Sequence, residues 1–234
     1  MIPLRDVIPS RTTPYITVTI IVLNLLAWLF ELALPRDVLP AFLKVYGVVP
    51  ANFRVSTLVT SMFLHGTAST LVTSMFLHGS WMHVIGNMWY LWIFGDNVED
   101  RVGHGRFVIF YLLCGIAAAF GQILIDPTST LPTIGASGAI AGVMGAYFVL
   151  YPRSRVLTLI PLPIFWQIVE LPAIFLLGFW FLMQLVSAGA IAVTSSTGGG
   201  GVAFAAHVAG FLIGVGGIFV FRKRQRRDEW WASR

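Results

Sequence analysis

Charged residues are scarce in this chain. Asp, Glu, Lys and Arg together make up 11% of the residues, against about a quarter in an average soluble domain. Hydrophobic residues make up 57%, and the mean hydropathy is +0.82. This composition excludes an ordinary soluble protein and indicates a helical protein that crosses a membrane several times. Because no long polar segment separates the apolar runs, we expect a single domain over residues 1–234.

Cysteine is almost absent as well. Cys114 is the single cysteine of the chain and lies in an apolar run, which excludes an internal disulfide. A single thiol says nothing about the redox compartment.

The few positive charges are placed unevenly. Five of the fifteen Lys and Arg residues lie within Arg222–Arg227, directly after an apolar run. Such a cluster is typical of an anchor at the membrane surface rather than of a nucleic-acid site. We therefore expect the lipid bilayer as a partner and expect no nucleic acid.

Six apolar segments qualify as membrane spans, most of them close to the ~20 residues that a spanning helix needs. They are Tyr15–Leu34, Trp81–Gly95, Arg106–Ile125, Ile134–Tyr151, Pro172–Val193 and Val202–Phe221. A further apolar stretch, Val156–Val169, holds Pro161 and Pro163. It is too short and too rich in proline for a span, so we predict an interfacial loop there.

Charge then sets the orientation of these spans. With six spans both chain ends lie on one side, and that side collects twelve Lys and Arg residues against three on the other. The positive-inside rule therefore predicts that residues 1–14 and the basic tail 222–234 are both cytoplasmic. The predicted fold class is an all-α membrane protein with a bundle of six transmembrane helices.

Two polar residues interrupt the apolar segments. Ser137 lies in a Gly-Ala-Ser-Gly motif, and His207 lies in an Ala-His-Val-Ala-Gly motif. Polar groups at membrane depth are costly and usually functional. A serine with a neutral histidine, the form that burial favours, is the minimum for nucleophilic acyl transfer. The alternatives are a small-residue packing face around Ser137 and a structural histidine bonded to a backbone carbonyl.

Further polar residues fall at the same predicted depth. His83 and Asn87 stand four residues apart, on one helical face near the start of the second span. In this topology they reach the level of Ser137 and His207, where they can donate to an oxyanion. The alternative is interhelical hydrogen bonding that serves structure alone. We expect His78 to support this network.

No acidic residue falls in the outer half of the second, fourth or sixth span. We therefore predict a two-residue Ser137–His207 dyad in which packing orients the histidine. The histidines His78, His83 and His207 can in principle bind zinc, but no carboxylate lies near them and no His-Glu-x-x-His motif occurs. We expect no metal.

Glycines recur near these residues. Gly135 and Gly138 flank Ser137, and Gly210 follows His207 by three positions. Small residues let membrane helices approach closely. We predict that these glycines bring the fourth and sixth spans together, so that Ser137 Oγ comes within reach of His207.

The segment Ser56–Gly66 recurs identically at Ser69–Gly79, thirteen residues later. Two copies are too few for a repeat fold, and we interpret them as a recent duplication or an assembly error. Only the second copy runs directly into the segment with His83. We expect the additional residues to bulge within Arg36–Thr70 and to leave the site intact.

These motifs, in this order and spacing, resemble the rhomboid family of intramembrane serine proteases in its bacterial six-helix form. The resemblance runs from about residue 15 to residue 221. It implies that Ser137 is the nucleophile and His207 the base, and that His83 and Asn87 line the oxyanion site. It also implies that there is no metal or organic cofactor, and that the substrates are membrane-anchored proteins cut in or near a transmembrane helix.

The resemblance further implies a bacterial plasma membrane protein whose site opens on the extracytoplasmic side. Glu99 and Arg101 resemble a structural motif of the family. In some members an aromatic residue four positions after the serine packs on the histidine, but Ala141 stands there in this chain. The alternative function is an impaired relative that binds transmembrane segments without cutting them. A solute transporter is disfavoured because the chain shows no paired halves.

Overall fold

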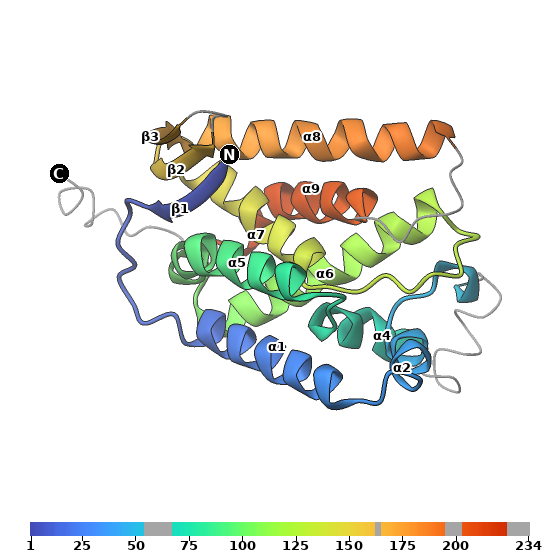
Figure 1. Ribbon diagram of the computed structural model, residues 1–234. Helices are drawn as coiled ribbons and strands as arrows, with labels where there is room; N and C mark the ends of the chain where they lie inside the picture. The colour runs from blue at the N-terminus through green and yellow to red at the C-terminus, as the bar shows by residue number, and fades with distance from the viewer. Residues whose placement is uncertain (54–66, 162–164, 195–202, 224–234) are drawn as a thin grey trace.

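The computed structural model describes residues 1–53, 67–161, 165–194 and 203–223. Helices form the greater part of these residues, packed as a bundle with a small sheet at one end (Figure 1). The first copy of the duplicated segment, Ser56–Gly66, lies outside the described residues. The predicted bulge therefore stays a prediction.

The α-helices are α1 (Tyr15–Ala33), α2 (Leu39–Tyr46), α4 (Thr67–Thr73), α5 (Trp81–Val102), α6 (His104–Ile125), α7 (Ser137–Leu150), α8 (Ala173–Thr194) and α9 (Phe204–Phe221). Two short 3₁₀ helices, η1 (Pro50–Asn52) and η2 (Ser74–Phe76), lie between α2 and α5. Helices thus occur at all six apolar segments that the sequence indicates.

A three-stranded antiparallel sheet shows that the all-α prediction was wrong in one respect. Strands β1 (Ile2–Asp6), β2 (Arg155–Pro161) and β3 (Trp166–Pro172) pair in the order β1-β2-β3. The described part of the stretch predicted as a loop therefore forms two paired antiparallel strands. Val156 and Thr158, two residues apart on β2, are both fully buried, which is the period of a strand. The pairing satisfies backbone groups that a loop would leave open.

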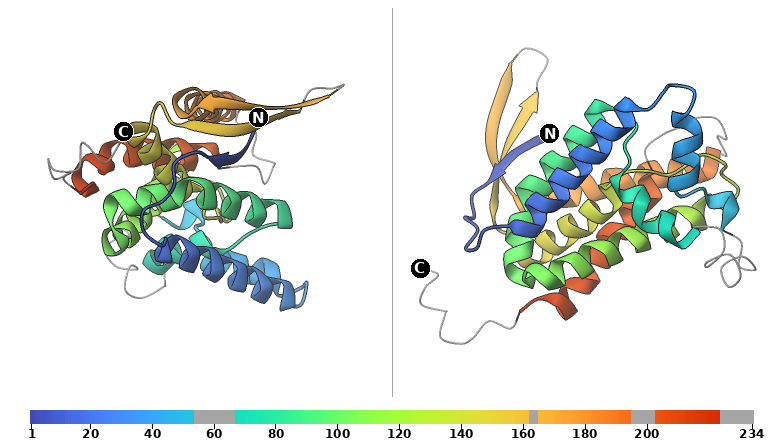
Figure 2. Two further views of the ribbon diagram at one scale, coloured as in Figure 1. Left: turned by 90° about the vertical axis from the view of Figure 1, so that its left-hand side faces the viewer. Right: turned by 90° about the horizontal axis from the view of Figure 1, so that it is seen from below.

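Helix α7 is the centre of the bundle. Every residue from Gly138 to Tyr147 on it is buried, because α5, α6, α8 and α9 all pack against it. The views in Figure 2 agree with this arrangement, with α1 lying outside α5. Because α7 is packed between other helices, the residues at its start are held in fixed positions.

Helices α7 and α9 pack backbone to backbone through glycine. A Cβ atom at Gly210 would overlap with the carbonyl oxygen of Gly138, and one at Gly214 would overlap with that of Gly142. A Cβ at Gly138 itself would meet the Cβ of Ala118 on α6. The glycines therefore set how closely the three helices approach one another.

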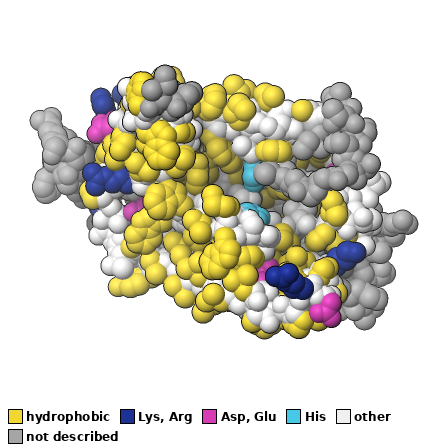
Figure 3. Space-filling model, in the orientation of Figure 1, with side chains coloured by type: hydrophobic (Ala, Val, Ile, Leu, Met, Phe, Trp, Pro, Cys, Tyr) yellow, Lys and Arg dark blue, Asp and Glu magenta, His cyan; other side chains and the backbone are white. Residues whose placement is uncertain are grey.

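Four of the described helices, α1, α6, α8 and α9, are long and apolar enough to cross a membrane. On the face in Figure 3 hydrophobic side chains predominate, and the charged ones gather toward the two ends of the molecule. This distribution fits a protein that sits across a bilayer, with its charges at the interfaces. The chain is an integral, multi-pass membrane protein.

The start of α1 is capped by a carboxylate from α5. No side chain of its own N-cap residue serves this purpose. Instead, Glu99, which is fully buried, accepts hydrogen bonds from the backbone N–H groups of Ile16 at 3.0 Å and Thr17 at 2.8 Å. His104 Nδ1 lies 2.5 Å from the same carboxylate. The carboxylate satisfies donors that a helix leaves open and complements the helix dipole.

We expect Glu99→Gln to lower the free energy of unfolding by about 1–3 kcal/mol, because charge-assisted hydrogen bonds to α1 are lost. The measurement is the melting temperature of the purified protein in detergent. Glu170→Gln is the control, since Glu170 forms an exposed ion pair with Arg155 at 3.4 Å and such pairs contribute little. Equal losses in the two variants would contradict a capping role for Glu99.

Candidate active site

Ser137 and His207 meet at the starts of two neighbouring helices. Ser137 is the first residue of α7, and His207 lies in the first turn of α9. Ser137 Oγ is 2.8 Å from His207 Nε2, which is hydrogen-bond distance. His207 is 8% exposed, and Ser137 is half-buried. In this geometry the imidazole can take the hydroxyl proton.

The other ring nitrogen of His207 has a partner that the sequence analysis missed. Nδ1 lies 2.7 Å from Oε1 of Gln184 on α8. The ring of Trp180, one turn earlier on α8, lies 5.7 Å from the imidazole between centroids. The histidine is therefore oriented by a hydrogen bond as well as by packing. A glutamine in the middle of an apolar run was the signal available in the sequence.

His83 and Asn87, both on α5, lie beside the loop that leads into Ser137. Gly135 on that loop has a φ of +120°, which side chains other than glycine rarely adopt. A Cβ at Gly135 would come within 2.6 Å of His83 Nε2 and 3.6 Å of Asn87 Nδ2. Gly135 is thus needed for its backbone conformation and for space, whereas Gly138 and Gly210 serve helix packing.

His78 connects this group to α1. Its Nε2 is 3.0 Å from Asn87 Nδ2, and its ring lies 5.0 Å from that of His83. Burial lowers the pKa of His78 to about 4, helped by the neighbouring His83. His78 is therefore neutral at pH 7 and can accept a hydrogen bond from the Asn87 amide. The second amide hydrogen of Asn87 remains for another acceptor.

Glu31 is a further residue that the sequence analysis did not select. It lies near the end of α1, is 2% exposed, and accepts a hydrogen bond from the His78 backbone N–H at 3.1 Å. A carboxylate inside an apolar run was the available signal. Glu31 holds the segment that enters α5 and so helps to place His83 and Asn87.

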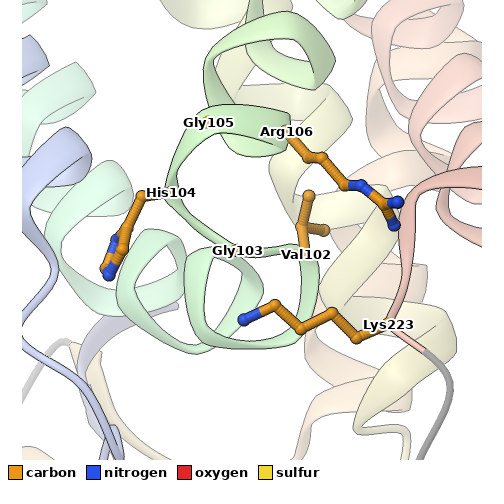
Figure 4. Close-up of a pocket in the computed structure, with 6 residues that line it drawn as sticks. All are labelled: Val102, Gly103, His104, Gly105, Arg106 and Lys223. Carbon is orange, nitrogen blue, oxygen red and sulfur yellow. The ribbon is translucent and has the colours of Figure 1, made fainter.

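A pocket at the turn between α5 and α6 is separate from the candidate site around Ser137 and His207 (Figure 4). It is lined by Val102–Arg106 and Lys223 and contains none of the candidate residues. His104 faces α1 there, where its ring contacts that of Tyr15. Among the described residues, no three His, Cys, Asp or Glu side chains are placed to hold a metal ion.

The sequence of this chain was compared with those of known proteins. The model of the rhomboid domain matches residues 65–224. The match thus includes the second copy of the duplicated segment and only the last two residues of the first. It also includes all the candidate residues except Glu31.

Three relatives illustrate the range of similar proteins. Rhomboid protein 1, mitochondrial, of Saccharomyces cerevisiae is 28% identical over 57% of this chain and 36% of its own length. Rhomboid protease GluP of Bacillus subtilis is 37% identical over 31% of this chain and 14% of its own length. Rhomboid-like protein 11, chloroplastic, of Arabidopsis thaliana is 30% identical over 61% of this chain and 49% of its own length.

The matched part of this chain therefore spans half or less of each of these three relatives. The domain match, by contrast, covers more than half of the chain and every helix from α5 to α9. This chain belongs to the rhomboid family.

Proposed function

We propose that the protein is an intramembrane serine endopeptidase that cleaves membrane-anchored proteins in or near their transmembrane helix. The observation that carries this proposal is the 2.8 Å contact between Ser137 Oγ and His207 Nε2. The contact joins two helices of a membrane protein, where an unneeded serine–histidine pair would only cost free energy. One relative carries the word protease in its name, Rhomboid protease GluP, which supports the same reaction class.

In the proposed reaction, Ser137 Oγ attacks the carbonyl carbon of the scissile peptide while His207 Nε2 takes the hydroxyl proton. The tetrahedral intermediate collapses when the histidine returns this proton to the leaving amine. Water then attacks the acyl-enzyme by the same route and releases the carboxylate product. The hydrogen bonds of a substrate helix must open first, so a helix weakened by small or helix-breaking residues is the preferred substrate.

His83, Asn87 and the Ser137 backbone N–H are the proposed donors to the oxyanion. The first N–H groups of an α-helix have no acceptor within the helix, and Ser137 begins α7. Asn87 retains one amide hydrogen beyond its contact with His78. His83 Nε2 lies close to Gly135, which is two residues before Ser137 on the loop that leads into α7.

We expect Asn87→Ala to lower kcat by about 10²–10³-fold with little change in KM, because it removes a donor that acts in the transition state. Steady-state cleavage of a reconstituted substrate is the measurement. Ile85→Ala is the control, since Ile85 lies two residues away on α5 with its side chain 50% exposed. An increase in KM at unchanged kcat would show instead that Asn87 contributes to substrate binding.

The proposed topology has six transmembrane helices, with both chain ends in the cytoplasm. In this proposal α5 and α7 are the fifth and sixth spans, in addition to the four long apolar helices α1, α6, α8 and α9. The excess of Lys and Arg residues on one side supports the orientation. Single-domain organisation over 1–234, a bacterial plasma membrane and a site that opens on the extracytoplasmic side are part of the same proposal.

The proposal is tested by incubating the reconstituted protein with a single-span model substrate and mapping product ends by mass spectrometry. We expect product ends in or near the span, and none with Ser137→Ala. Binding of the substrate without any product would overturn the proposal and would favour the impaired relative that binds transmembrane segments.

A further inference from the structure

His207 lies in a chain of three hydrogen-bonded side chains that come from three different helices. Its Nε2 faces Ser137 Oγ of α7 at 2.8 Å, and its Nδ1 faces Gln184 Oε1 of α8 at 2.7 Å. His207 itself is on α9. Both ring nitrogens therefore have a hydrogen-bond partner. In a neutral imidazole one nitrogen donates and the other accepts, so the two contacts together decide which nitrogen carries the proton.

The contact with Gln184 selects one tautomer of the histidine. An amide oxygen has no hydrogen to give, so it can bond to Nδ1 only when Nδ1 carries the proton. The neutral imidazole then has its lone pair on Nε2, at the Ser137 hydroxyl. This is the tautomer that can accept the serine proton, and the hydrogen bond made by the second nitrogen selects it.

An amide suits this position better than a carboxylate does. His207 is 8% exposed, and a carboxylate beside it would place a formal charge at membrane depth, at a large desolvation cost. A neutral amide oxygen still orients the ring and accepts from Nδ1. This explains why an acid is not needed next to the histidine.

The helix that carries Gln184 is less buried within the protein than the helices that carry the other two residues. Of the segment Ala173–Ala190 in α8, 17% is buried, against 39% of Phe204–Phe221 in α9, and α7 is buried along most of its length. Trp180 against His207 and Phe181 stacked on Phe211 at 4.6 Å are contacts that hold α8 to α9. The orientation of His207 thus depends on α8 lying against α9.

We propose that Gln184 is a positioning residue of the active site, which holds His207 in the proton-accepting tautomer and makes this tautomer depend on the docking of α8. The inference rests on the proposed protease function. It adds a third side chain to the predicted Ser137–His207 pair.

The test compares Gln184→Met with Gln184→Glu in the full-length protein. Met matches the length of Gln but replaces the acceptor with a weak one, so we expect kcat to fall about 100-fold with KM within about twofold. Glu keeps an acceptor oxygen in either protonation state, so we expect its kcat to exceed that of the Met variant at least about tenfold. A mere packing role predicts the reverse order, because Met suits an apolar helix better.

Imidazole ¹⁵N NMR of the protein provides a readout independent of cleavage. We expect the Nδ1–H tautomer in the wild type and a shift toward Nε2–H in Gln184→Met. Met183→Leu is the matched control, because Met183 precedes Gln184 on α8 and its own side chain is 46% exposed. This variant should retain the wild-type rate and tautomer.

Wild-type kcat in Gln184→Met, or equal losses in the Met and Glu variants, would overturn the role of Gln184. Ser137→Ala in the same assay separates the two proposals. If wild type cleaves and Ser137→Ala does not while Gln184→Met matches wild type, only the inference about Gln184 fails. If wild type and Ser137→Ala behave alike, the proposed function fails.

Discussion

Ser137→Ala and His207→Ala are each expected to lower the cleavage rate of a transmembrane substrate by about 10⁴-fold or more. The first removes the attacking oxygen, and the second removes the base 2.8 Å from it. Because the two side chains act as one unit, the double variant should be hardly slower than either single variant. Cleavage by the three proteins in one reconstituted preparation is the measurement.

Ser187→Ala provides the control for the serine exchange. It removes a hydroxyl from α8, another helix of the bundle, and should leave the rate within about twofold. Melting temperatures near that of the wild type in all variants would show that the losses are chemical. A double variant whose rate loss is the product of the two single losses would contradict a joint role for Ser137 and His207.

Gly210→Ala is expected to lower the free energy of unfolding by about 3 kcal/mol, because the new methyl group overlaps with the carbonyl oxygen of Gly138. Helices α7 and α9 must separate to make room. The same separation moves His207 away from Ser137, and a displacement of about 1 Å can cost about 10²-fold in rate. We therefore expect stability and cleavage to fall together.

Gly216→Ala is the matched control for this prediction. It lies on the same helix, and a Cβ there meets no heavy atom within 4 Å. Its stability should stay within about 1 kcal/mol of the wild type, and its cleavage rate should not change. Similar losses in the two alanine variants would show that general helix effects, and not the α7–α9 contact, are responsible.

The main helices of this fold and the meeting of Ser137 with His207 could be predicted from the sequence. Long apolar runs and spaced glycines carry that information directly, since the bilayer restricts the chain to helices or closed barrels. The catalytic roles of the two residues stay a proposal. The sheet was missed because a short apolar run with prolines reads equally as a loop or a strand, and its partner β1 lies far away in the sequence.

Gln184 and Glu31 were missed for a different reason. The usual third member of a serine–histidine site is a carboxylate, so a neutral glutamine was not predicted to serve there. Glu31 belongs to α1, outside the three spans whose starts share that depth. Pairings of this kind depend on which helix faces act as neighbours, and a single sequence does not specify them.

The most direct test of the central claim is labelling by a fluorophosphonate probe, which reacts with an activated serine and needs no transmembrane substrate. The wild type should be labelled at Ser137, Ser137→Ala should not be labelled, and His207→Ala should be labelled far more slowly. Equal labelling of the wild type and Ser137→Ala, or labelling unaffected by His207→Ala, would contradict the proposal that His207 activates Ser137.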